Sequence, residues 1–250
     1  MPTVVVTGAT GAIGSATVAE LTRRRAQVIP LSRPSLDLSS FASVRAAARE
    51  LNRTAGHIDA LLHIAAAYLT GYQKNSDRIE LMLATNHLGP FLLTNLLRDR
   101  LARGGRVITV TAPSGTHVDI DRLLDRDRFS AFHSFGATKA ANLLFTFELA
   151  RRASRWDVRA NAFHPGIVRS QLARDGPRVA RLAMQWFGRD ASRPAQDLVD
   201  LALSPAHAGT TGWFFKGGRR IEPPRSTMNV AHQAELWKRS AELVELESGF

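Results

Sequence analysis

The chain has 250 residues, of which 44% are hydrophobic and 22% are charged, a balance that excludes a mostly disordered protein. It contains no cysteine, which excludes disulfides, cysteine-ligated zinc, iron–sulfur clusters and thiol catalysis. The formal net charge is +11, but the basic residues form only short clusters without interleaved aromatic residues. We therefore expect no nucleic-acid partner.

The N-terminal segment predicts a strand and not a targeting sequence. Met1-Pro2-Thr3-Val4 lacks the basic and apolar regions of a signal peptide. The apolar stretch at 81–97 is interrupted by Asn86, His87, Gly89 and Pro90, so it is too broken to predict a membrane span. We expect a cytoplasmic protein, in keeping with the absence of cysteine.

Short apolar runs alternate along the chain with segments of helical periodicity. Strands are predicted at 3–7, 27–32, 58–65, 105–111, 157–163 and 211–216, with at most a stub at 36–38. Helices are predicted at 12–25, 40–54 with Ser40 as N-cap, 76–103 with a kink at Pro90, 133–154, 178–187, 193–203 and 229–246. Apolar strands that alternate with helices predict a parallel sheet covered on both faces, in a single α/β domain over 1–250.

A glycine-rich turn lies between the first predicted strand and the first predicted helix. We call this segment, Thr7-Gly8-Ala9-Thr10-Gly11-Ala12-Ile13-Gly14, the glycine turn. Its glycines allow the backbone to turn sharply and to approach a pyrophosphate, which then sits at the positive end of the helix. At this place in an α/β chain it predicts a dinucleotide site; a merely tight loop is the alternative. The expected contacts are Gly8, Thr10, Gly11, Ile13 and Gly14.

Three further segments carry a family resemblance. They read Asn86-His87-Leu88-Gly89-Pro90-Phe91-Leu92-Leu93-Thr94, Lys139-Ala140-Ala141-Asn142-Leu143-Leu144-Phe145-Thr146 and His164-Pro165-Gly166-Ile167-Val168. With ALSP at 202–205 and LWKRS at 236–240, they resemble the short-chain dehydrogenase/reductase family over nearly the whole chain. The nearest branch is the one of retinol-dehydrogenase-like and WW-domain-oxidoreductase-like proteins. The resemblance implies a Rossmann-type doubly wound sheet of about seven strands, and a homodimer or homotetramer formed through the helices at 76–103 and 133–154.

The chain departs from the family's catalytic pattern at two positions. The family's tyrosine stands four residues before its lysine, and here Phe135 stands before Lys139. The family's serine follows the strand predicted at 105–111, and here Ala112 occupies that place. Asn86 and Lys139, the family's other two catalytic positions, are retained. The candidate substitutes for the lost groups are Thr111, Ser114 and His133.

These two departures restrict the chemistry. Reduction of a ketone needs a hydride on carbon and a proton on oxygen, and Phe135 has no proton to donate. Acid–base groups contribute about 10²–10⁴-fold, so an ordinary alcohol–ketone cycle should be severely slowed. Three functions stay open: a reductase of iminium or enone acceptors in bacterial specialised metabolism, a non-redox cyclase, dehydratase or isomerase in the same pocket, and a silent protein that binds a cofactor or a partner.

The residues after the second strand predict the cofactor. An NAD-preferring site would hold an acidic residue there, but the chain has Ser32-Arg33, and arginine suits a 2′-phosphate. NADP(H) is therefore expected over NAD(H), with a solvated Arg33 as the alternative. By resemblance, the other cofactor contacts are Asp37, Leu38, Ala65, Ala66, Lys139, Pro165, Gly166, Ile167 and Ser170.

The substrate is expected to be a small apolar molecule. By resemblance, the segment 169–193 covers it, with Leu172, Met184, Trp186 and Phe187 as apolar side chains; a stripe facing the core explains the same residues equally well. His63, His87 and His164 are expected to be structural. No spacing of His, Asp or Glu supports a metal site.

Overall fold

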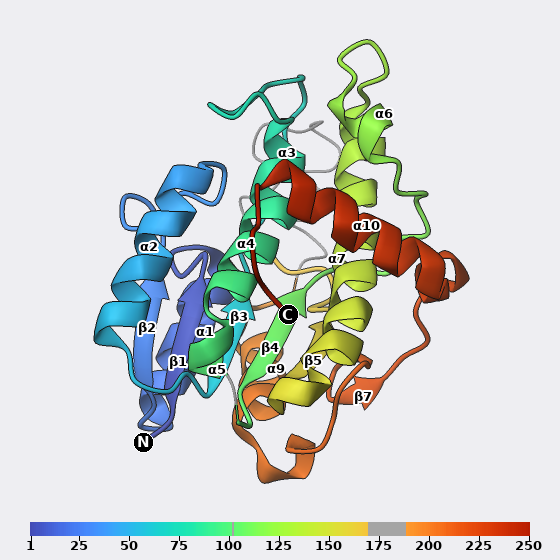
Figure 1. Cartoon of the computed structure of the whole chain (residues 1–250). Helices are drawn as coiled ribbons and strands as arrows, with labels where there is room; N and C mark the ends of the chain where they lie inside the picture. Colours follow the sequence, from blue (N-terminus) through green and yellow to red (C-terminus); the bar gives the residue numbers. More distant parts are fainter. Residues whose placement is uncertain (102, 170–188) are drawn as a thin grey trace.

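The structure, a computed structural model, describes residues 1–101, 103–169 and 189–250, and its centre is a seven-stranded sheet (Figure 1). The strand order is β2-β1-β3-β4-β5-β6-β7, and every neighbouring pair is parallel except β6 and β7. The strands are β1 Thr3–Thr7, β2 Gln27–Leu31, β3 Ala60–His63, β4 Arg106–Val110, β5 Arg159–Phe163, β6 Phe214–Lys216 and β7 Arg219–Arg220. The predicted α/β, Rossmann-type doubly wound sheet is confirmed.

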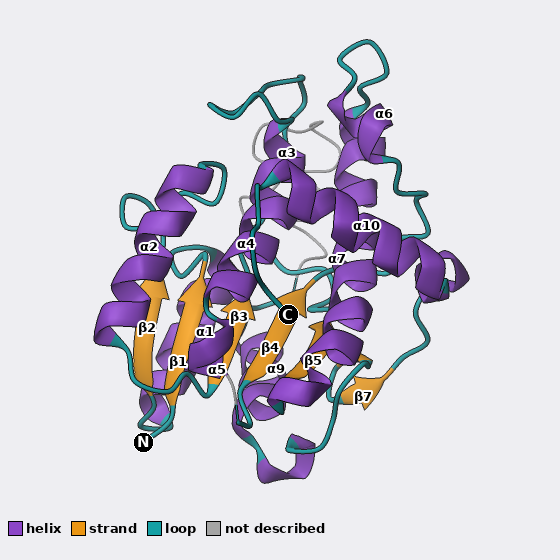
Figure 2. Cartoon of the chain, in the orientation of Figure 1, coloured by secondary structure: helices purple, strands orange, loops and turns teal. Residues whose placement is uncertain are grey.

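Helices cover both faces of this sheet (Figure 2). One layer contains α1 Ala12–Arg23 and α9 Ser192–Leu203, and the other contains α2 Phe41–Thr54, α4 Gly89–Leu96, α7 Ala131–Arg152 and α10 Val230–Leu243. The short helices are α3 Leu81–Leu83, α5 Arg98–Leu101 and α6 Ile120–Leu124. Successive side chains of a strand point to opposite faces, so Val5 packs in the α2–α4 layer while Val4 and Val6 pack in the α1–α9 layer.

The strand order reverses at β1, which lies between β2 and β3. The connection from β2 to β3 therefore crosses to the other side of β1, and the loops that follow β1 and β3 separate at the carboxyl ends of these strands. Such a reversal leaves a crevice in which α/β proteins bind ligands. It places the glycine turn beside the segment that follows β3.

The helix expected over most of 76–103 is confirmed between residues 81 and 101, but this part of the chain is divided into several pieces. Residues 76–80 are not helical, and α3 is followed by a π-helical turn at Ala84–Leu88, then by α4 and α5. Pro90 has no N–H to donate to the carbonyl of Asn86, four residues earlier. The side-chain amide of Asn142 on α7 donates to that carbonyl instead, at 3.0 Å. The disturbance therefore begins before Pro90 and is compensated from another helix.

Most other boundaries agree with the predictions to within a few residues. Ser40 caps α2 as expected, since its hydroxyl accepts from the backbone N–H of Ser43. The predicted stub at 36–38 is not a strand, and the sequence analysis did not anticipate α6 or β7. The helix predicted at 178–187 lies outside the described residues. None of the described helices combines the length and the apolar character that a membrane crossing requires.

The C-terminal helix α10 covers α4 and α7 (Figure 1). Trp237 packs against Phe91 and Phe145, with ring centroids 4.9 Å and 5.9 Å apart. The guanidinium of Arg152 lies 4.8 Å from the Trp237 ring centroid. The surfaces through which the oligomer was expected are thus occupied by the chain's own helix. The oligomer stays a prediction, and it would need a different surface.

Candidate active site

The glycine turn has the backbone shape that a dinucleotide needs. Gly8 has φ +69°, and a Cβ there would lie 2.7 Å from the Cα of Ala65, so only glycine fits between β1 and the segment after β3. A Cβ on Gly14 would collide with the carbonyl of Gly8. The glycines at 8 and 14 therefore allow the close packing of β1, α1 and the β3 loop, and Ala65 lies at the same contact.

The N-terminus of α1 is open. Its N-cap is Gly11, which offers no side chain to the first N–H groups, and no acidic residue stands in the first turn. Among the described residues, a Cβ on Gly11 would meet only the Gly8 carbonyl, at 3.4 Å. Uncapped N–H groups at a helix N-terminus favour an anion. The residues present therefore fit the pyrophosphate of a dinucleotide. In the sequence, Thr10 precedes Gly11 and Ile13 follows it by two residues.

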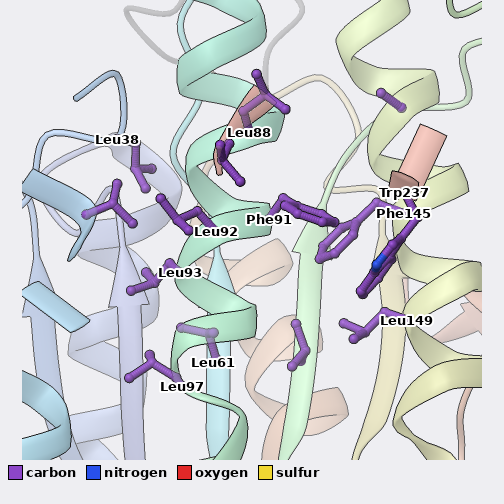
Figure 3. Packing of buried hydrophobic residues seen from close by; sticks show 14 of the residues in the cluster. Leu38, Leu61, Leu88, Phe91, Leu92, Leu93, Leu97, Phe145, Leu149 and Trp237 are labelled. Carbon is purple, nitrogen blue, oxygen red and sulfur yellow. The ribbon is translucent and has the colours of Figure 1, made fainter. Parts of the chain in front are cut away.

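The loop after β2 places Arg33 and Asp37 differently. Arg33 is exposed, and the preceding Ser32 is half-buried. The carboxylate of Asp37 accepts from the backbone N–H and the hydroxyl of Ser39, at 2.9 Å and 2.6 Å. Leu38 is buried in the core with its carbonyl close against Gly89 (Figure 3). Only the backbone of Leu38 is therefore left to border an adenine, since its side chain lies in the core.

Asn86 clamps the segment that follows β3. Its side-chain oxygen accepts from the backbone N–H of Ala67 at 2.7 Å, and its amide nitrogen donates to the carbonyl of Ala67 at 2.9 Å. The same nitrogen donates to the Thr138 hydroxyl at 3.2 Å. Asn86 thereby fixes the backbone between Ala66 and Tyr68 and ties it to α7.

Lys139 lies buried beneath the ring of Phe135. The two residues are one turn apart on α7, and the Lys139 Nζ lies 5.0 Å from the ring centroid. Lys139 is 7% exposed, and burial lowers its pKa to about 8. At the position where the resemblance places the family's proton donor, the structure has an apolar ring that attracts the ammonium through its face.

The hydroxyl candidates are used in different ways. Thr111 is buried and donates to the carbonyl of Lys139 at 2.8 Å, which ties the end of β4 to α7. The Ser114 hydroxyl donates to Thr116 Oγ1 at 3.0 Å. Both of these lie against Gly136, since a Cβ there would be 3.4 Å from Ser114 Oγ and 2.6 Å from Thr116 Oγ1. Ser114 is thus brought beside the first turns of α7, next in sequence to Phe135, while half-buried Ala112 offers no hydroxyl.

His133 lies on a different side of α7 from Phe135 and Lys139. Successive residues of an α-helix are rotated by about 100°, so side chains two positions apart, such as those of His133 and Phe135, point in nearly opposite directions. Its pKa is lowered by burial and by the charge of Arg122, with Asp119 acting in the opposite sense. His133 therefore faces the α6 region, and the structure does not bring it together with Lys139.

The three motif histidines differ in their bonding. His63 and His87 are buried, and burial lowers their pKa values to about 3 and about 4. His63 Nε2 lies 2.7 Å from Thr94 Oγ1, and His87 Nε2 lies 2.9 Å from Ser240 Oγ. Within the described ranges, Nδ1 of His63 and Nδ1 of His164 have no hydrogen-bond partner. His63 is therefore a core histidine that is satisfied at one nitrogen only.

The last described residues of this part of the site follow β5. Gly166 has φ +77°, and Ile167 is 62% exposed after half-buried Pro165. Ser170 and most of the substrate-covering segment, including Leu172, Met184, Trp186 and Phe187, lie outside the described residues. An exposed isoleucine at the carboxyl end of the sheet is available for an apolar contact with a ligand.

Tyr68 is a site residue that the sequence analysis missed. Its ring meets the Phe135 ring edge-on, with centroids 5.3 Å apart and an interplanar angle of 75°. It follows directly after the backbone that Asn86 clamps. The available signal was its place a few residues beyond the carboxyl end of β3, at the edge of the sheet where α/β proteins bind ligands.

Comparisons with known proteins agree with this arrangement. Residues 3–200 match the family model described as Enoyl-(Acyl carrier protein) reductase. The chain is 33% identical over 269 residues to a Streptomyces protein described as a daunorubicin C-13 ketoreductase (DnrU), covering 97% of this chain and 92% of that one. It is 31% identical to mouse retinol dehydrogenase 14, covering 97% and 85%. A crystal structure of an uncharacterized protein from Mycobacterium Paratuberculosis has a TM-score of 0.82, with 29% identity and coverage of 100% and 96%.

The fold and the glycine turn are typical of dinucleotide-binding α/β proteins, and the comparisons specify the family. The chain belongs to the short-chain dehydrogenase/reductase family of NAD(P)-dependent oxidoreductases. Solved structures with the same fold include a 3-alpha-hydroxysteroid dehydrogenase with NADH and a short chain dehydrogenase with NADP. These two are 20% and 21% identical to the chain, so they support the fold alone.

Proposed function

We propose that this protein is an NADP(H)-dependent reductase of an apolar enone or iminium substrate. The observation that carries the proposal is the replacement of the family's phenol by Phe135, whose ring lies 5.0 Å from Lys139 Nζ. An iminium accepts a hydride directly to become a neutral amine. A conjugated enone becomes an enolate, which can take its proton from a group other than residue 135. Neither acceptor depends on the missing hydroxyl.

The cofactor assignment is supported by residues from four segments. The uncapped N-terminus of α1 would hold the pyrophosphate, exposed Arg33 would pair with a 2′-phosphate, and Lys139 would bond the nicotinamide ribose. Ile167 would border the nicotinamide. When bound, the reduced nicotinamide supplies the hydride.

The chain's own residues give the pocket its character. Phe135 and Tyr68 form an aromatic wall, and exposed Ile167 extends the apolar surface. Lys139 is buried beneath that wall, so its positive charge acts in a medium of low dielectric constant. One relative's name denotes a ketoreductase and another's a retinol dehydrogenase, so apolar carbonyl or alcohol substrates are a reasonable class for this chain as well.

The experiment is a titration of the purified protein with NADPH and with NADH, followed by nicotinamide fluorescence. We expect binding of NADPH at micromolar concentrations and clearly weaker binding of NADH. A panel of enones and imines is then tested for consumption of NADPH. Absence of binding for both dinucleotides would overturn the proposal and leave non-redox chemistry or a partner protein as the function.

A further inference from the structure

We propose that the Tyr68 hydroxyl is the proton donor of this site, and that the substrate is the enone of the two acceptor classes named in the proposed function. The inference rests on the proposed function and narrows it, because an iminium needs no such donor. Phe135 cannot supply a proton, and Ala112 cannot hydrogen-bond an oxyanion. Tyr68 is the aromatic residue that meets Phe135 directly, with ring centroids 5.3 Å apart.

Hydrogen bonds to the neighbouring backbone fix the position of Tyr68. Asn86 binds both backbone groups of Ala67, at 2.7 Å and 2.9 Å, so the residue that precedes Tyr68 is held from two sides. The same Asn86 amide reaches Thr138 on α7, next to Lys139. One side chain thus fixes the loop that carries Tyr68 relative to the helix that carries Phe135 and Lys139. Asn86 acts as a positioning residue for the phenol.

The chain's other tyrosine is engaged elsewhere. The sequence contains two tyrosines, Tyr68 and Tyr72. Tyr72 donates its hydroxyl to the carbonyl of Leu124 at 2.6 Å and packs edge-on against Phe129. The phenol of Tyr68 lies instead at the Phe135 ring, whose centroid is 5.0 Å from the Lys139 ammonium. The family's reaction uses a phenol as its proton donor, and here the loop after β3 would supply that phenol.

The proton step balances without a further reagent. Hydride addition forms a C–H bond at the β-carbon of the enone, and the C=C π electrons move to give an enolate. The O–H bond of Tyr68 then breaks as its proton passes to the α-carbon of the enolate, where a second C–H bond forms, and the phenolate recovers a proton from water. The enone is reduced to the saturated ketone while the dihydronicotinamide is oxidised.

The test compares Tyr68→Phe with Tyr72→Phe, which removes the same atom outside the site. The probes are trans-chalcone as the enone and 3,4-dihydroisoquinoline as the imine. We expect Tyr68→Phe to lower kcat for chalcone by about 10²-fold or more, because that is the scale of acid–base assistance. NADPH affinity and any imine reduction should stay within about twofold of wild type, since the phenylalanine keeps the ring contact. Tyr72→Phe should retain chalcone reduction.

A second readout does not depend on turnover. The protein is produced with 3-fluorotyrosine, so that its ¹⁹F spectrum has two resonances, which the two variants assign. We expect NADPH to shift the Tyr68 resonance and to leave the Tyr72 resonance in place. An unmoved Tyr68 resonance would overturn the inference.

The kinetic outcomes separate this inference from the proposed function. If the wild-type protein binds NADPH and reduces the imine but not chalcone, the proposed function stands and the role of Tyr68 is wrong. If Tyr68→Phe lowers enone and imine reduction equally, the residue only packs, and the inference is again overturned. If the wild-type protein binds neither dinucleotide, both proposals fall.

Discussion

The ammonium of Lys139 lies 5.0 Å from the ring centroid of Phe135, one helical turn earlier on α7. A cation over an aromatic face gains about 0.5–2 kcal/mol, depending on how far it is desolvated. The ring thus compensates part of the burial that lowers the pKa of Lys139 to about 8. The lysine keeps its place although the hydroxyl that it serves in the family is absent.

Restoring the family's two lost groups should restore ketone chemistry. We expect the double variant Phe135→Tyr with Ala112→Ser to reduce acetophenone at least about 10²-fold faster than wild type, because a phenol would stand one turn from Lys139. Phe135→Leu is the matched control and should give no gain. The measurement is NADPH consumption with acetophenone. A double variant that folds and binds NADPH without any gain would indicate a reshaped pocket.

Removing the buried charge should stabilise the protein without cofactor. A pKa of about 8, against the ordinary lysine value of 10.5, means that the folded state holds the Lys139 proton less tightly than the unfolded chain. The cost in folding free energy of burying the Lys139 ammonium is complete below about pH 8 and disappears as the pH rises to 10.5. The stability of the protein therefore increases with pH in that window. Lys139→Met should therefore raise the free energy of unfolding at neutral pH by about 1–2 kcal/mol, after the lost ring contact is subtracted.

Urea unfolding near neutral pH and at a pH above 10.5 tests this expectation. The gain should vanish at the higher pH, and NADPH binding should be lost in the variant at both. Lys74→Met, at an exposed position, is the control and should change stability little. Equal stability of wild type and Lys139→Met at neutral pH would contradict the buried-charge account.

His87 should make the protein sensitive to mild acid. Burial lowers its pKa to about 4, from the ordinary histidine value of 6.5, so the unfolded chain takes up a proton first as the pH falls. Stability from this group is complete above pH 6.5 and is lost as the pH falls toward 4, by roughly 2–3 kcal/mol. His87→Gln should remove its share of this dependence in thermal melts and leave the share of His63, whose pKa is lowered to about 3, whereas His57→Gln, at an exposed position, should change nothing.

Trp237 should be essential for the covering of α4 and α7 by α10. Its ring is 6% exposed and contacts Phe91 and Phe145 (Figure 3). Trp237→Ala should lower the free energy of unfolding by about 3–5 kcal/mol through cavity formation. Trp213, which is 42% exposed, provides the control, and Trp213→Ala should cost much less. Denaturant melts measure both, and a loss under 1 kcal/mol for Trp237→Ala would contradict this packing.

Arg33 should distinguish the two dinucleotides. A hydrogen bond to a charged group contributes about 1.5–3 kcal/mol, so Arg33→Ser should weaken NADPH binding by about ten- to a hundredfold and leave NADH nearly unchanged. Arg53→Ser, which removes an exposed arginine paired with Glu50, is the control. Fluorescence titration of both variants with both dinucleotides measures the effect. An equal loss for NADPH and NADH would mean that Arg33 does not meet the 2′-phosphate.

The sequence by itself determined features that depend on near neighbours in the chain. The order of strands and helices follows from the spacing of apolar residues, and the start of α2 follows from Ser40, whose hydroxyl caps a backbone three residues away. The glycine turn and the position of Phe135 four residues before Lys139 are equally local. These features lie within a few residues of each other, so a pattern can predict them.

Only the tertiary structure decided which distant groups meet. It brought Tyr68 to Phe135, supplied Asn142 to the carbonyl that Pro90 leaves free, and laid α10 over the two helices expected to form an oligomer. It also turned His133 away from Lys139 and engaged Thr111 with a backbone carbonyl. Each of these outcomes depends on the strand order and on the packing of side chains from remote segments, and neither is encoded in the spacing of neighbouring residues.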